Sequence, residues 1–161
     1  SKNKKIVDAL EAVTQAKEAA ARKARVGVTG KQLGEVALKV NDISLMADFY
    51  RDVVQLTELR REPHMAFLKI SEGFQGHTSI LALFKRGEEA VQPSGSLDHI
   101  ALSIDLKDFE LEKKRLEALG LTVDIDQHNW VQWKSLYFTD PEGNRVEFVC
   151  FDPSIPKNFE S

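Results

Sequence analysis

Three ionisable residues stand in segments whose other side chains are mostly apolar or small. Glu35 and His99 each open a predicted strand, and Glu147 lies within a third. Successive side chains of a strand point to opposite faces. Val146 and Phe148 therefore share the face that packs on helices, and Glu147 takes the other face. We expect all three ionisable side chains to point into one cleft.

A divalent metal ion explains this combination of residue types. A buried carboxylate without a partner costs on the order of several kcal/mol, so a carboxylate in a cleft needs a compensating group. One imidazole nitrogen and two carboxylates, completed by water, suit Fe, Mn, Zn, Ni or Co. The sequence therefore predicts a divalent metal ion bound by Glu35, His99 and Glu147. We also predict that one of the two carboxylates leaves the metal and acts as a base.

Each of these residues has a plainer interpretation when it is taken alone. His99 can be a histidine at a strand end that is bonded to the backbone. Glu147 can face solvent from an edge strand, and Glu35 can pair with Lys39 or Arg145. The metal interpretation therefore depends on the three residues together.

An internal repeat places two of the three residues at equivalent positions. Residues 33–40 read Leu-Gly-Glu-Val-Ala-Leu-Lys-Val, and residues 97–104 read Leu-Asp-His-Ile-Ala-Leu-Ser-Ile. Each segment alternates between branched apolar residues on one face and small or polar residues on the other, as a strand with two distinct faces does. Glu35 in the first copy is thus the counterpart of His99 in the second.

A helix and further strands are predicted after each repeated segment. Asp42 or Ser44 can cap the first helix; Asp108 can cap the second, and Gly120 ends it. The strand-like stretches are 65–70 and 78–84 in the first copy, and 121–125, 135–139 and 145–151 in the second, with a turn at 140–144. The predicted fold class is α+β: two tandem βαβββ modules forming a curved mixed sheet around a cleft, with an extra N-terminal helix.

The predicted modules leave a segment at each end of the chain. Residues 4 to 25 or so are rich in Ala, Lys and Glu and contain no Gly or Pro, which favours a helix. Its apolar stripe is narrow, so we expect this helix to pack on the body of the protein or on a second subunit. The predicted division is an arm and linker at 1–32, modules at 33–86 and 96–152 within a domain at 33–152, and a tail at 153–161.

Aromatic and polar residues are predicted to line the cleft around the metal. Residues 128–135 are predicted to form a loop that supplies His128, Trp130 and Trp133 to a substrate pocket, and Phe67 is a further pocket residue. Trp133 can instead cap the core. Tyr137 lies two residues after Ser135 on a predicted strand, so the two side chains share a face. Tyr137 is therefore predicted to face the cleft and donate a hydrogen bond to a substrate oxygen.

Composition narrows the class of protein. The 161 residues are 42% hydrophobic and 29% charged with a net charge of −3, which is typical of a globular domain and argues against a nucleic-acid-binding patch. A single cysteine excludes an intrachain disulfide and a cysteine-rich zinc site. No apolar run reaches the roughly 20 residues that span a bilayer, and charges interrupt the N-terminal stretch. We therefore expect a cytoplasmic protein that binds no membrane.

Three stretches of the chain together resemble a known superfamily. They are 33–42 with 49–52, then 97–102, and then 137–148, which contains the pattern aromatic-x-Asp-Pro-x-Gly-Asn-x-x-Glu. Across 33–152 the chain resembles the vicinal oxygen chelate superfamily. Its members include glyoxalase I, methylmalonyl-CoA epimerase, fosfomycin-resistance enzymes, extradiol dioxygenases and bleomycin-binding proteins. The resemblance implies a glyoxalase-like domain over these residues.

The resemblance also implies where a metal binds. Ligands in the family come from the first strand of each module and the last strand of the second, which are Glu35, His99 and Glu147 in this chain. The chain departs from the family at Glu35, where many members have His and some glyoxalases have Gln. A fourth ligand used by some members would fall near Leu81 or Ala82, which are both apolar.

The function implied by the resemblance is a divalent-metal-dependent enzyme that acts on a small oxygenated molecule by lyase, isomerase or transferase chemistry. Two alternatives stay open. One is a ring-cleaving Fe(II) dioxygenase, and the other is a metal-free protein that binds a small molecule or confers resistance to it. Because members of the superfamily commonly form homodimers, a homodimer is expected.

Overall fold

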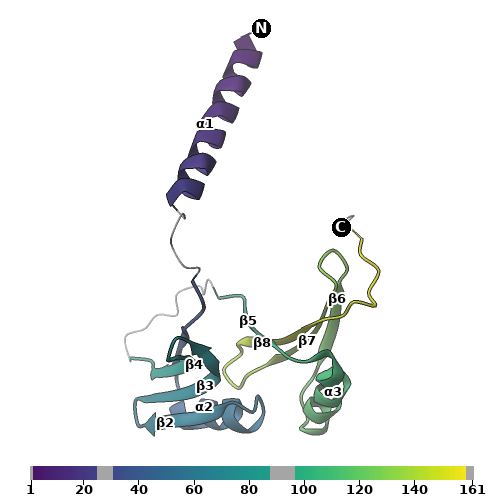
Figure 1. The fold of residues 1–161 in the computed structure, drawn as a ribbon. Coiled ribbons are helices and arrows are strands. Elements are labelled where there is room, and N and C mark those ends of the chain that lie inside the picture. Colours follow the sequence, from purple (N-terminus) through teal and green to yellow (C-terminus); the bar gives the residue numbers. More distant parts are fainter. Residues whose placement is uncertain (1, 25–30, 88–96, 159–161) are drawn as a thin grey trace. The chain divides into compact units, whose positions relative to one another are not determined.

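The computed structural model describes residues 2–24, 31–87 and 97–158, drawn as coloured ribbon in Figure 1. The chain divides into two compact units, residues 1–33 and 34–161. Most of the stretch between the two predicted modules, residues 87–95, lies outside the described residues, as does the end of the predicted arm and linker at 25–30.

The described part of the first unit contains the helix α1 (Lys2–Ala24), which the sequence predicted. Its large apolar side chains, Ile6, Val7, Leu10 and Val13, are all at least half exposed. No helix within the described ranges is both long and apolar enough to span a bilayer.

The second unit begins with a module of one helix and four strands. The chain runs through β1 (Glu35–Val40), α2 (Ile43–Asp52), β2 (Thr57–Glu62), β3 (Met65–Phe74) and β4 (His77–Lys85). The strand order in the sheet is β1-β4-β3-β2. Strand β1 runs parallel to β4, whereas the other pairs are antiparallel.

The second module repeats this arrangement. It contains β5 (His99–Ser103), a 3₁₀ turn at Leu106–Asp108, α3 (Phe109–Ala118), β6 (Asp124–His128), β7 (Trp133–Thr139) and β8 (Arg145–Phe151). The sheet order β5-β8-β7-β6 matches that of the first module, with β5 parallel to β8. The prediction of tandem βαβββ modules is therefore confirmed, and hydrogen bonds join the strands as two four-stranded sheets.

The two sheets share a hydrogen-bonding register as well as an order. Ala37 pairs with Ala82 in the first sheet, and its counterpart Ala101 pairs with Glu147 in the second. Ala82 therefore occupies the position in the first module that Glu147 occupies in the second. This register supports the view that the first module lacks an equivalent carboxylate ligand.

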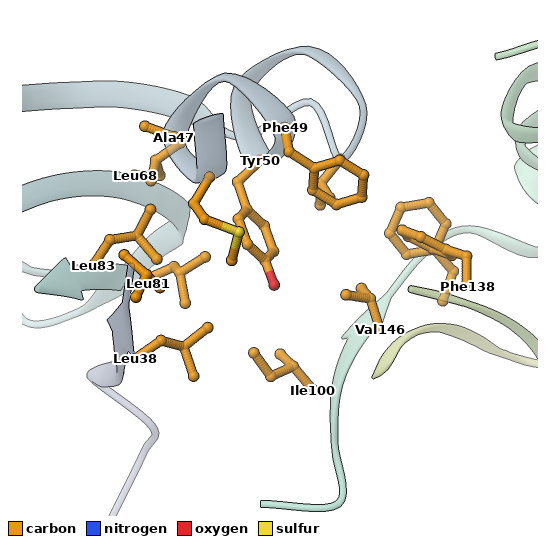
Figure 2. Close-up of a cluster of buried hydrophobic side chains, with 14 of the residues drawn as sticks. Leu38, Ala47, Phe49, Tyr50, Leu68, Leu81, Leu83, Ile100, Phe138 and Val146 are labelled. Atoms are coloured by element: carbon orange, nitrogen blue, oxygen red, sulfur yellow. The ribbon is translucent and has the colours of Figure 1, made fainter. Parts of the chain in front are cut away.

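The core lies on the helix-facing side of each sheet. Figure 2 shows Ala47 and Tyr50 of α2 beside Leu68, Leu81 and Leu83 of the first sheet. Phe109 and Leu116 of α3 are likewise buried with the inward side chains of the second sheet, which include Leu136, Phe138, Val146, Phe148 and Cys150. This arrangement leaves the opposite face of each sheet for Glu35, His99 and Glu147.

The helix ends agree with the sequence in part. The Asp42 side chain accepts a hydrogen bond from the Leu45 backbone N–H at 2.9 Å, so Asp42 rather than Ser44 caps α2. Asp108 occupies the N-cap of α3 but makes no capping hydrogen bond through its side chain. Gly120 follows α3 with a φ of +86°, as expected of a residue that ends a helix.

Three strand predictions were wrong or missing. Strand β2 was not predicted, because its sequence, Thr-Glu-Leu-Arg-Arg-Glu, is largely polar and lies at the edge of the sheet. Strand β6 begins at Asp124 instead of residue 121, because Leu121 and Val123 pack on the core before pairing with β7 begins. Trp133 lies in β7 and not in the predicted loop, which therefore spans only residues 129–132.

Polar contacts join the two modules at the turn before β8. The Tyr50 hydroxyl donates to Asp140 at 2.8 Å, in a buried position. Burial, and then the charge of Asp140, raises the pKa of Tyr50, so this hydroxyl stays protonated as a donor. The Glu142 carboxylate accepts from the backbone N–H groups of Asn41 and Asp42, just before α2 begins. The motif that carries the family resemblance thus also connects the modules.

The single cysteine is part of the core. Cys150 is 5% exposed, and its thiol lies 3.7 Å from the backbone oxygen of Lys134. Burial raises the pKa of this thiol.

The hairpin between β3 and β4 provides a test of the backbone geometry. Gly73 and Gly76 both have positive φ angles, of 75° and 83°. A β-carbon at Gly73 would overlap the backbone oxygen of His77, whereas one at Gly76 would meet no atom within 4 Å. We expect Gly76→Ala to cost about 1 kcal/mol, from backbone strain alone, and Gly73→Ala to cost at least about twice as much. Urea unfolding of both variants measures this difference, and equal losses would contradict the close approach of Gly73 to His77.

Candidate metal centre

A polar contact on the open face of the second sheet joins His99 to Glu147. The Nε2 atom of His99 lies 2.9 Å from Oε2 of Glu147. The other carboxylate oxygen of Glu147 accepts a hydrogen bond from the Ser135 hydroxyl at 2.6 Å. Glu147 is 5% exposed and lies in β8, between β5 and β7, so it is not a solvent-facing residue on an edge strand.

The second nitrogen of His99 is also held by a carboxylate. Its Nδ1 atom lies 2.6 Å from Oδ2 of Asp98, and this contact lowers the pKa of Asp98. A neutral imidazole has a single N–H, so it can donate to only one of the two carboxylates. The contact with the other carboxylate requires a second proton or a metal ion. His99 is therefore not the backbone-bonded histidine of the plainer interpretation.

The geometry of the pair suits adjacent ligands of one ion. Two neighbouring ligands of an octahedral ion, each about 2.1 Å from the metal, lie about 3 Å apart. The separation of 2.9 Å between Nε2 and Oε2 agrees with this value. The Asp98 contact supplies the outer-shell hydrogen bond that commonly orients a metal-binding histidine. The residues present thus fit a divalent cation.

Glu35 is placed differently from the other two predicted ligands. It is exposed at the start of β1, opposite Ile80 of β4. Among residues 2–24, 31–87 and 97–158, no group of three or more His, Cys, Asp or Glu side chains is arranged to hold a metal ion. The structure therefore brings His99 and Glu147 together and does not group Glu35 with them within one chain.

Tyr137 lies beside the His99–Glu147 pair. It is opposite Glu147 in the register, and its ring centroid is 6.0 Å from that of His99. Its hydroxyl is 3.4 Å from Nε2 of His128. Burial, and then the charge of Glu147, raises the pKa of Tyr137, so its hydroxyl remains a donor near neutral pH. The guanidinium of Arg145 lies 3.9 Å from the centre of the same ring.

The other predicted pocket residues are spread over both modules. Trp130 and Trp133 are 59% and 45% exposed with ring centroids 6.5 Å apart, so Trp133 does not cap the core. His128 ends β6, close to Tyr137. Phe67 lies in the first module, where its half-buried ring packs edge-on against Phe84.

Two cavities among the described residues differ in size. A cavity of about 550 Å³ lies around the start of α2 and the β2–β3 turn, lined by residues such as Ser44, Arg61 and Lys85. It contains none of the predicted site residues. A smaller one of about 190 Å³ includes Tyr137 and Arg145 and therefore adjoins the candidate metal centre.

Sequence reasoning missed two residues that hold the pair in place. Asp98 directly precedes His99, and its acidic character was the available signal. Ser135 lies two residues before Tyr137 in the same strand, so the sequence predicts that both side chains lie on the cleft face. Neither contact follows from sequence alone, because each depends on the rotamer of a side chain across or along the sheet.

Comparison with known proteins agrees with the arrangement of the modules. Residues 32–148 match the model of the Glyoxalase/Bleomycin resistance protein/Dioxygenase superfamily. The chain belongs to this superfamily. The resemblance noted from the sequence is thereby confirmed.

Curated relatives of this superfamily member carry transferase names. The chain is 31% identical over 121 residues to "Metallothiol transferase FosB" of Staphylococcus epidermidis (strain ATCC 12228 / FDA PCI 1200), which covers 71% of this chain and 78% of the relative. It is 28% identical over 118 residues to "Glutathione transferase FosA" of Serratia marcescens, covering 73% and 79%. These relatives are enzymes of the transferase class.

A solved structure shows the same fold. The integron cassette protein HFX_CASS4, from the mobile metagenome of the Halifax Harbour sewage outfall, is 28% identical and has a TM-score of 0.59. The similarity covers 76% of this chain and all of that chain.

Proposed function

We propose that this protein is a divalent-metal-dependent transferase that joins a thiol to a small oxygenated molecule. The observation that carries the proposal is the buried Glu147 carboxylate 2.9 Å from the imidazole of His99, on neighbouring strands. The transferase names of FosB and FosA favour this chemistry over the lyase and isomerase chemistries that the fold also hosts. In such a transfer, the sulfur forms a bond to a carbon while that carbon loses its bond to oxygen. The oxygen keeps the electron pair and takes the proton of the thiol.

The residues have distinct parts in the proposed reaction. His99, Glu147 and Glu35 would hold a divalent ion, which when bound would supply Lewis-acid stabilisation of the substrate oxygen. Asp98 holds the His99 ring, and the Tyr137 hydroxyl donates a hydrogen bond to a substrate oxygen. Glu35 or Glu147 serves as the base that receives the thiol proton. The walls of the pocket are formed by His128, Trp130, Trp133 and Phe67.

We propose that Glu35 reaches the ion from a second copy of the chain, in a homodimer. Two features support this arrangement. Glu35 is not grouped with His99 and Glu147 in the described part of one chain, although the repeat makes it the counterpart of His99. Strands β1 and β5 also each end their sheet with one edge that pairs with no other described strand. Such edges tend to be covered or paired, and a second copy can do this.

Removal of either paired ligand tests the metal centre. We expect the purified protein to bind about one divalent ion per chain, and His99→Ala or Glu147→Gln to weaken its binding by at least about a hundredfold. Chelator should abolish thiol transfer to an epoxide or similar electrophile, and added metal should restore it. Metal analysis and a transfer assay measure both. His64→Ala, at an exposed turn histidine, is the matched control and should bind metal as the parent chain does.

The same measurements separate the competing functions. If the parent chain binds no ion but binds small molecules, it is a metal-free binding or resistance protein. Bound iron together with oxygen uptake on catechols would identify a ring-cleaving dioxygenase. Full metal content in both His99→Ala and Glu147→Gln would show that the proposed centre is wrong.

A further inference from the structure

We propose that His128 is a positioning residue for Tyr137 in the transfer reaction. Its Nε2–H group donates a hydrogen bond to the phenolic oxygen, so that the Tyr137 proton points towards the His99–Glu147 pair. The value of this arrangement for catalysis rests on the proposed function, in which Tyr137 donates to a substrate oxygen. The direction of the hydrogen bond follows from the contacts of the two side chains.

His128 and Tyr137 lie on the open face of neighbouring strands. His128 ends β6 opposite Trp133, which is four residues before Tyr137 in β7. Residues four apart in a strand share a face, as do residues that are opposite each other in the register. The two side chains meet with the Tyr137 hydroxyl 3.4 Å from Nε2 of His128. Such contacts are often long in the absence of substrate and shorten in the complex.

The single proton of the Tyr137 hydroxyl is directed away from His128. Burial, then the charge of Glu147 and also a hydrogen bond to this carboxylate raise the pKa of Tyr137. An ionised carboxylate only accepts hydrogen bonds, so Tyr137 is the donor in this pair. The Ser135 hydroxyl cannot supply the phenolic oxygen with a proton, because it donates its own to Glu147 at 2.6 Å. His128 is therefore the side chain that is placed to donate to the phenolic oxygen.

The surroundings of His128 favour a proton on Nε2. The Oδ2 atom of Asp126 lies 3.9 Å from this nitrogen. Negative charge near a ring nitrogen attracts a proton to it and disfavours a lone pair there. The proton on Nε2 then faces the phenolic oxygen, and the lone pair of the neutral ring lies on Nδ1. Asp126 thus helps to select the tautomer in which His128 is a donor.

The ring of Tyr137 is already fixed by its neighbours. The Arg145 guanidinium lies over the ring, 3.9 Å from its centre. The His99 ring packs against it edge-on, with the two ring planes at 85°. With the ring held, rotation of the O–H bond is the main freedom that remains. A hydrogen bond from His128 disfavours the planar orientation of this bond that points to His128, which leaves the donor aimed at the metal centre before a substrate arrives.

Nuclear magnetic resonance of the full chain tests the direction of this hydrogen bond without turnover. Nitrogen-15 shifts of the imidazole rings are measured with chelator present at a pH of about 8.5, where an ordinary histidine is neutral. We expect His128 to be fully protonated at Nε2, whereas the exposed His64 should show a mixture of the two tautomers. The carbon-13 shift of the phenolic carbon reports hydrogen bonds to the oxygen, so His128→Phe should move the Tyr137 signal and leave that of Tyr50 in place. Protonation of His128 at Nδ1, or an unmoved Tyr137 signal, would overturn the proposal.

Two substitutions separate hydrogen-bond donation from packing. His128→Phe keeps a ring but has no donor, so it should lower kcat for thiol transfer about tenfold, with a smaller effect on KM. His128→Gln supplies an amide N–H in place of Nε2–H, so it should lower kcat no more than about threefold and keep the Tyr137 carbon-13 signal. In a Tyr137→Phe background, His128→Phe should cause no further loss of kcat, because the group it positions is absent. His64→Phe is the matched control and should change neither kcat nor the tyrosine signals.

The resonance measurements involve neither metal nor turnover, so they separate this proposal from the proposed function. A proton on Nε2 and a Tyr137 signal that depends on His128, in a chain without transfer activity, would support the hydrogen bond and reject the transferase. Transfer activity with equal losses of kcat in His128→Gln and His128→Phe would reject the positioning role and retain the transferase.

Discussion

Co-expression of two inactive variants, Glu35→Ala and Glu147→Gln, should restore metal-dependent activity. In the proposed homodimer, each site combines Glu35 of one copy with His99 and Glu147 of the other. A mixed dimer then has one site made only of intact residues and one that has lost both Glu35 and Glu147. Random assembly of equal amounts should leave about a quarter of all sites intact, and dimers purified through two different tags about half.

Each variant alone should have almost no activity, because every site in its homodimer lacks one ligand. The effect therefore amounts to a gain from near zero to about a quarter of the parent activity per site. Transfer rate and bound metal per chain, measured on the same samples, should rise together. Size-exclusion chromatography with light scattering measures the oligomeric state that shared sites require.

The matched control pairs His99→Ala with Glu147→Gln. Both substitutions lie in the second module, so every site of a mixed dimer loses one of the two ligands and the mixture should stay inactive. If the first mixture also stays inactive although mixed dimers form, Glu35 does not act across the dimer. If Glu35→Ala alone retains full metal and activity, Glu35 is not a ligand.

Replacement of Asp140 should give the largest loss of stability among the residues of the module junction. Its carboxylate accepts four hydrogen bonds, from the Tyr50 hydroxyl, the backbone N–H groups of Glu142 and Asn144, and the Asn144 side chain. Asp140 is 4% exposed, so water cannot readily replace the lost acceptor. Each buried donor left unpaired costs about 1–3 kcal/mol. We expect Asp140→Ala to lower the free energy of unfolding by about 3–5 kcal/mol, measured by urea denaturation.

Two further variants resolve the sources of this loss. Tyr50→Phe removes only the contact between the modules and should cost about 1–2 kcal/mol. Asp108→Ala is the matched control, because Asp108 makes no capping hydrogen bond, and should cost less than about 0.5 kcal/mol. Equal losses for Asp108→Ala and Asp140→Ala would show that the Asp140 network does not form.

The sequence predicted the structure best where the alternation of apolar residues coincided with the internal repeat. The alternation in 33–40 and 97–104 located β1 and β5, and the matching register of the two sheets follows from the repeat. The turn at 140–144 was recognised from its residues, and alternation along the strand that follows placed Glu147 on the face opposite Val146 and Phe148. These features are local, so propensity and periodicity suffice to predict them.

The parts that escaped prediction depend on contacts between distant residues. Strand β2 is polar because it lies at an edge, and pairing with β3 makes it a strand. Strand β6 begins only after Leu121 and Val123, because these two side chains pack against the core. The convergence of His99 and Glu147 was expected, but the exposed position of Glu35 was not, because alternation fixes the face of a strand and not the distance between sheets.

The buried position of Cys150 bears on whether the proposed transferase would be modified by its own electrophilic substrate. An electrophile that reacts with thiols would also alkylate an accessible thiol of the protein that handles it. Cys150 is enclosed by the core, and its raised pKa keeps the sulfur in the poorly nucleophilic protonated form. The chain has no other cysteine. With Cys150 buried, no accessible protein thiol competes with the proposed thiol co-substrate for the electrophile or forms a mixed disulfide with the co-substrate.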